Sequence, residues 1–142
     1  MWEIAPVDKP CQLIHNTAEL PRQRSEAIVD LMNQTIFTNH LVYRRTDRWL
    51  RLNATEKAQA SQEIQKLIAN YEGKVLVRGV YSTVGFRHDS DVVFWLLTDD
   101  VDQLQNFAVD LRHTLFGQCS QFSWTFPGLT RPPEFVGDHY AA

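Results

Sequence analysis

A short run from His88 to Asp91 brings possible metal ligands together in this sequence. It contains one imidazole and two carboxylates, a set that zinc or manganese could use. Neighbouring side chains on a strand point to opposite faces, however, and metal sites usually recruit ligands from several elements. We therefore interpret the run as part of a turn and predict no metal site.

The histidines are scattered: His15, His40, His88, His113 and His139. A haem ligand needs an imidazole held on a rigid element and oriented by a further hydrogen bond. The long helix expected between Ala54 and Tyr71 contains no histidine.

Other catalytic patterns are missing as well. The sequence has no glycine-rich phosphate loop and no nucleophile elbow. Asp99, Asp100 and Asp102 form a cluster of carboxylates. A helix is expected to start there, and carboxylates at a helix start cap its free amides and interact favourably with its dipole. No catalytic residue is predicted.

Two further groups have two interpretations each. Arg44, Arg45, Arg48 and Arg51 are either a solvated rim beside a strand end or a site for an anion or an acidic partner. The second group consists of aromatic residues in predicted strands, which either fill the core or line a small-molecule cavity. Its members are Tyr81, Trp95, Trp124 and Phe126.

Bulk properties indicate a globular protein. The 142 residues are 44% hydrophobic and 22% charged, enough for one domain with its own core. A net charge of −3 argues against nucleic-acid or anionic-membrane partners. Cys11 and Cys119 lack metal-ligand spacing, and no stretch resembles a membrane span or a secretion signal. We expect a cytoplasmic protein.

The elements that must position these residues follow from apolar periodicity and from helix end signals. Asn53 and Glu56 form a capping box, and Gly73 can end that helix in a left-handed conformation. Gly117 is expected to stop the second helix. The predicted elements are a strand at 36–44, a helix at 54–71, strands at 75–84 and 92–97 joined by a hairpin loop at 85–91, a helix at 101–115 and a strand at 121–126.

This order predicts an α+β, ferredoxin-like βαββαβ fold, in which two helices cover one face of an antiparallel sheet. The domain is expected at residues 35–130. It follows an N-terminal arm at 1–34, which includes a short helix from Pro21 to Asn33, and precedes a tail or linker at 131–142.

The other face of this sheet is expected to be covered as well. The strand at 92–97 is apolar on both sides, and alternation puts Val77 and Tyr81 together on one face. Phe122, Trp124 and Phe126 should likewise share a face. We expect a homo-oligomer or a partner domain to supply the second layer.

Four blocks of sequence resemble the chlorite dismutase family and, within it, the coproheme decarboxylases. They are RGVYSTVGFR at 78–87, DSDVVFW at 89–95, LRHTLFG at 111–117 and WTFPGLTRPPEF at 124–135. The resemblance covers roughly Thr35 to Tyr140 and is to the N-terminal of two ferredoxin-like repeats. In that family the repeats pair as a dimeric α+β barrel, the subunits form rings, and a histidine of the C-terminal repeat ligates haem iron.

The resemblance implies that this chain lacks the half that carries the chemistry. No cofactor is expected for this chain alone. In the family, haem or coproheme is bound by the C-terminal half. Glu63, Ile64 and Gln65 fall where that half has its iron ligand. The resemblance also indicates Arg44, Trp49 and Arg51, because the corresponding segment of the other repeat contributes to the porphyrin cavity. Together with the neighbouring phenol and one strand aromatic, the candidate cavity residues are Tyr43, Arg44, Trp49 and Tyr81.

Three functions remain open. The favoured one is a non-catalytic half that serves structure and oligomerisation in a haem oxidoreductase of this family. The second is a self-contained homodimeric α+β barrel enzyme that binds haem or a small apolar substrate. The third is a partner-recognition module that uses the arginines between Arg44 and Arg51.

Overall fold

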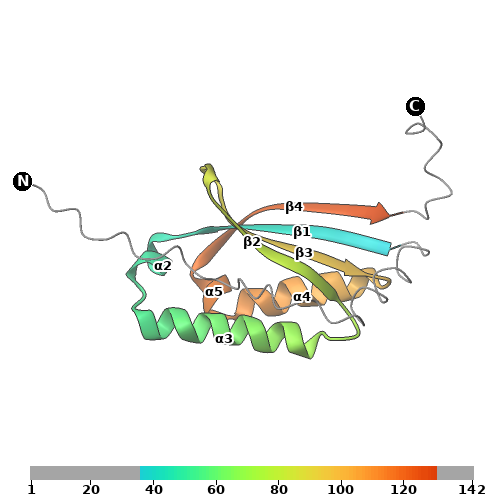
Figure 1. Cartoon of the computed structure of the whole chain (residues 1–142), viewed down its shortest axis with the longest axis horizontal. Coiled ribbons are helices and arrows are strands. Elements are labelled where there is room, and N and C mark those ends of the chain that lie inside the picture. Colours follow the sequence, from blue (N-terminus) through green and yellow to red (C-terminus); the bar gives the residue numbers. More distant parts are fainter. Residues whose placement is uncertain (1–35, 131–142) are drawn as a thin grey trace, which may run out of the picture.

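The computed structural model describes residues 36–130 (Figure 1). The arm, the helix predicted between Pro21 and Asn33 and the tail beyond Thr130 lie outside the described residues.

A four-stranded antiparallel sheet forms one layer of the domain. Its strands are arranged in the order β2-β3-β1-β4, so the first and third strands of the chain occupy the centre. Helices α3 and α4 both lie on one side of this sheet (Figure 1). This confirms the ferredoxin-like prediction. The strands are β1 (Ile36–Arg45), β2 (Leu76–Arg87), β3 (Ser90–Thr98) and β4 (Ser120–Thr130). The hairpin loop predicted at 85–91 is wrong, because both strands extend into it and only His88 and Asp89 separate them.

The helices are α2 (Asp47–Arg51), α3 (Ala54–Asn70), α4 (Val101–His113) and α5 (Leu115–Gln118). The capping box of α3 is confirmed, because Asn53 accepts from the Glu56 amide and Glu56 accepts from the Asn53 amide. Gly73 follows α3 with φ +78°, the left-handed conformation that its position required.

The predicted end of the second helix is wrong. Helix α4 ends at His113 because Thr114 is extended, and the Thr114 hydroxyl then caps α5 by accepting from the Gly117 amide at 3.1 Å. Gly117 therefore lies inside a helix instead of stopping one. A side chain there would collide with the Leu111 carbonyl, which explains the glycine.

The core lies between the helices and the sheet. Phe94 on β3 and Phe107 on α4 are completely buried, and burying such a side chain contributes about 1.5–3 kcal/mol. On α3 Ala60 is completely buried, whereas Ala58 is exposed. Val101, at the start of α4, is 50% exposed. None of the helices within 36–130 is long and apolar enough to cross a membrane.

Strand β2 does not alternate simply. Val77 pairs with Leu96 and Val80 pairs with Phe94, so both lie on the helix face although they are three positions apart. A bulge after Val77 supplies the extra residue. The predicted grouping of Val77 with Tyr81 is therefore wrong, because Tyr81 is displaced to the other face.

A second bulge divides the aromatic residues of β4. Phe122 pairs with Tyr43 on the helix side, and their ring centroids are 5.3 Å apart. Trp124 pairs with Val42 on the opposite side. The prediction that Phe122, Trp124 and Phe126 share one face is therefore correct only for the last two.

The face of the sheet away from the helices, which we call the open face, is covered by nothing within residues 36–130 (Figure 1). Two rows of paired residues cross it. One row contains Tyr81, Val93, Val42 and Trp124, and the next contains Gly79, Trp95, His40 and Phe126.

Candidate functional site

The open face carries the largest group of exposed aromatic side chains in the described chain. Tyr81 is 47% exposed, Trp124 50% and Phe126 58%. Apolar patches of this kind on a folded domain usually mark a contact surface. The open face is therefore the candidate functional surface.

Arg78, Trp95 and His40 lie together at its centre. The guanidinium carbon of Arg78 is 4.5 Å from the centroid of the Trp95 ring, and the His40 ring centroid is 5.0 Å from that of Trp95. The Trp95 indole N–H donates to the Thr38 hydroxyl at 3.0 Å, which fixes the orientation of the ring. A cation over an indole contributes about 0.5–1 kcal/mol at an exposed site.

Sequence reasoning did not select Arg78 or His40 for this surface. The bulge that places Arg78 over Trp95 has no clear signal in the residue types. Gly79 was the available indication, because a glycine inside a strand marks a close approach. A side chain at Gly79 would begin 2.5 Å from the Tyr81 ring, which occupies that space.

Trp124 also has a fixed orientation. Its indole N–H donates to Asp89 at 2.8 Å, and Asp89 in turn accepts two hydrogen bonds from Arg87, at 2.9 and 3.0 Å. These two donors hold the pKa of Asp89 well below its usual range. Trp124 lies on β4 and Asp89 immediately precedes β3, so this hydrogen bond joins segments on either side of β1.

The four predicted cavity residues are not brought together. Tyr43 and Trp49 are buried on the helix side, each edge-on to Phe116. Burial raises the pKa of Tyr43 to about 12. Arg44 and Tyr81 belong to the open face instead.

The basic cluster is also divided. The Arg45 guanidinium lies 3.6 Å from Asp91, and the Arg45 amide donates to the same carboxylate at 2.7 Å. Arg44, Arg48 and Arg51 are exposed. They belong to a strand and to the short helix α2, so the cluster is not one site.

Three side chains in the run from His88 to Asp91 are engaged with other protein groups. Asp89 and Asp91 bind Arg87 and Arg45, and the Ser90 hydroxyl is buried against Thr83 at 2.6 Å. No group of three potential protein ligands converges anywhere between residues 36 and 130.

Helix α3 offers no haem ligand. Ile64 is 1% exposed in the core, and Glu63 points to the start of α5, where it accepts from the Leu115 amide at 2.6 Å. This backbone hydrogen bond lowers the pKa of Glu63, with a smaller contribution from Gln59.

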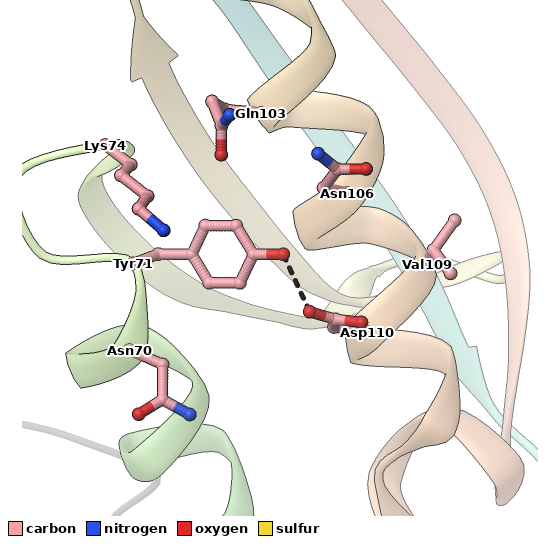
Figure 2. A pocket seen from close by; sticks show the side chains of 7 residues that line it. All are labelled: Asn70, Tyr71, Lys74, Gln103, Asn106, Val109 and Asp110. Atoms are coloured by element: carbon pink, nitrogen blue, oxygen red, sulfur yellow. Dashed lines mark hydrogen bonds between the residues drawn. The ribbon is translucent and has the colours of Figure 1, made fainter.

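A shallow groove of about 440 Å³ lies between the end of α3 and α4 (Figure 2). Across it the Tyr71 hydroxyl donates to Asp110 at 2.7 Å. The lining is polar and contains neither histidine nor cysteine, so it does not suit an iron porphyrin. The lining residues are Asn70, Tyr71, Lys74, Gln103, Asn106, Val109 and Asp110.

The family profile and the similar sequences all indicate the same family. A sequence profile of the chlorite dismutase family matches residues 57–142. The coproheme decarboxylase of Mycolicibacterium smegmatis is 35% identical over 89 residues, which make up 61% of this chain and 38% of that protein. The chlorite dismutase of Ideonella dechloratans is 25% identical over 101 residues, 71% of this chain and 35% of that protein.

Solved structures share the fold. A mutant chlorite dismutase from Candidatus Nitrospira defluvii superposes with a TM-score of 0.71 at 18% identity, over 79% of this chain and 47% of that one. A haem-binding protein from Thermus thermophilus gives 0.57 at 21% identity, over 68% and 41%. The chain spans less than half the length of each of these relatives.

Proposed function

The chain belongs to the chlorite dismutase family, and from this premise we propose that it is a haem-free half that packs its open face against a second ferredoxin-like repeat. Its role would be structural: to complete a two-sheet barrel and to support oligomerisation. The observation that carries the proposal is the exposed aromatic surface of Tyr81, Trp124 and Phe126. Removing apolar surface from water contributes roughly 25 cal/mol per Å², so a second sheet would be a stabilising cover.

The interior of this half supports the same proposal. An iron ligand on α3 would have to replace a core side chain such as Ile64 or the cap that Glu63 supplies to α5. The buried phenol of Tyr43 is surrounded by aromatic rings instead of a cavity. The residues of α3 and the core around Tyr43 therefore do not fit an axially ligated haem within residues 36–130.

Chemistry would then belong to the assembled protein. Relatives are a coproheme decarboxylase, chlorite dismutases and a haem-binding protein. We propose that a protein combining this chain with a second repeat is a haem- or coproheme-dependent oxidoreductase. Arg44 and Tyr81 are the two predicted cavity residues that a cofactor held by the second repeat could reach.

An absorbance titration of chain 1–142 with coproheme tests the proposal. We expect no saturable, sharpened Soret band, because the described residues provide no inward-facing ligand. Stoichiometric binding with a shifted band would contradict the proposal and favour a self-contained barrel enzyme. Myoglobin apoprotein titrated in parallel shows that the assay detects a real site.

A further inference from the structure

The charges of the open face are unbalanced. Arg44 and Arg78 are both exposed, and within residues 36–130 neither forms an ion pair. The carboxylates beside this face, Asp89 and Asp91, are already engaged by Arg87 and Arg45. Although the sequence as a whole has a net charge of −3, this face has an excess of cations.

The geometry of Arg78 suits a carboxylate. Its guanidinium lies over the Trp95 ring, 4.5 Å from the centroid, and that ring is held by Thr38. A guanidinium stacked in this way keeps the N–H donors of its edge available, and their fork matches the two oxygens of a carboxylate. A covering layer without such an acceptor would bury an unpaired charge, which is strongly unfavourable.

A second copy of this chain would be a poor cover. Two open faces placed together would bury Arg44 and Arg78 of both copies in one interface. Neither copy has a free carboxylate on the described part of this face to offer in exchange. Like charges across an interface exclude a partner as effectively as complementary charges select one.

We infer that the open face is built for a non-identical sheet that presents carboxylate side chains to Arg78 and Arg44, and not for a second copy of this chain. The inference rests on the proposed function and deepens it, since it specifies the chemistry of the covering repeat. The exposed aromatic residues of the open face would supply most of the binding affinity for the covering sheet. Arg44 and Arg78 would determine which sheet is bound.

The test uses the chain against a charge-reversed copy of itself. The Arg44→Glu/Arg78→Glu variant keeps the shape of the open face and makes it acidic. In sedimentation equilibrium at low salt we expect the wild type and the variant each to be monomeric. The equimolar mixture should form a heterodimer at least about tenfold tighter than either self-association, weakened by added salt.

The matched control is Arg48→Glu/Arg51→Glu, the same charge change on α2. Mixed with the wild type it should give no heterodimer. If the charge-reversed variant fails to fold by circular dichroism, Arg44→Gln/Arg78→Gln replaces it. This neutral variant should self-associate about tenfold more tightly than the wild type, because the repulsion is gone.

Three results would overturn the inference: a mixture that stays monomeric, a neutral variant that associates no better than the wild type, or a wild-type homodimer whose hydrogen exchange is protected along β3 and β4. The homodimer would leave the proposed function intact, because the open face would still be covered. Stoichiometric coproheme binding would instead contradict the proposed function, whatever the charges do.

Discussion

Two tyrosines show how burial decides the chemistry of a residue. Tyr43 is 1% exposed among aromatic rings, and Tyr71 donates its hydroxyl hydrogen bond to Asp110. Burial raises the pKa of both to about 12, and the adjacent Asp110 adds to the effect at Tyr71. The Tyr43 phenol is therefore a packing group, whereas the Tyr71 hydroxyl connects the end of α3 to α4 through Asp110.

Stability should consequently fall in alkali. Both tyrosines have an ordinary pKa of 10.0, so below that pH the folded and unfolded states hold the same protons. Between about 10 and 12 the unfolded state ionises first, and the free energy of unfolding decreases. We expect Tyr43→Phe/Tyr71→Phe to lose less stability than the wild type between roughly pH 9 and pH 11, measured by urea denaturation. Equal losses in the two proteins would show that these hydroxyls are not the groups responsible.

At the scale of elements, the tip of the β2–β3 hairpin is tied to the far strand. Asp89 receives hydrogen bonds from both Arg87 and Trp124, so a turn and strand β4 are connected across β1. The depressed pKa of Asp89 means that this contact is present above the usual aspartate range and is lost only as the pH falls below it.

Asp89→Asn should therefore loosen the hairpin tip without unfolding the domain. The amide loses the charge that attracts Arg87 and accepts more weakly from the indole. We expect faster hydrogen exchange at residues 84–89 and a shift in Trp124 fluorescence. Asp99→Asn, on an exposed residue without these contacts, serves as the control. Unchanged exchange at the tip would mean that the turn is held by its backbone alone.

The start of α3 gives a second prediction at this scale. Asn53 satisfies the Glu56 amide at 2.9 Å, and Glu56 returns a hydrogen bond at 2.8 Å. Asn53→Ala should lower the free energy of unfolding by about 1 kcal/mol, measured by urea denaturation, because a free amide is left at the helix end. Asn53→Ser should recover most of the loss. If alanine and serine behave alike, the cap does not contribute to stability.

At the scale of the whole molecule, the sheet has one face that folds the domain and one that is available for association. Phe126 is 58% exposed on the open face, whereas Phe94 on the helix face is fully buried. Substitutions on these two faces should therefore separate stability from binding.

Phe126→Asp should change the free energy of unfolding by no more than about 1 kcal/mol, since the ring is mostly in water already. The same change should clearly reduce the binding of a hydrophobic dye such as ANS. Val109→Asp, on the outer side of α4, is the control and should leave dye binding unchanged. A large loss of stability in Phe126→Asp would mean that the open face contributes to folding as well.

The sequence by itself determined the order and type of the four strands and the two long helices, but not the short helices α2 and α5. Strong end signals, such as the Asn53 capping box and Gly73, marked α3, and the apolar periodicity of α4 predicted its packing on the sheet. Local hydrogen bonds and side-chain periodicity act within a few residues, so they can be read from the order of residue types. The ferredoxin-like arrangement followed from these elements.

Only the tertiary structure decided which residues meet. Bulges on β2 and β4 shift the alternation, and they place Val77 with the core and separate Phe122 from Trp124. Burial likewise assigned Tyr43 and Trp49 to the core instead of to a cavity shared with Tyr81. A bulge changes the face of every following residue, and its position depends on the pairing of strands distant in the sequence. Gly79 marked a close approach in β2, but only the register of β2 against β3 decided that Arg78 stacks on Trp95.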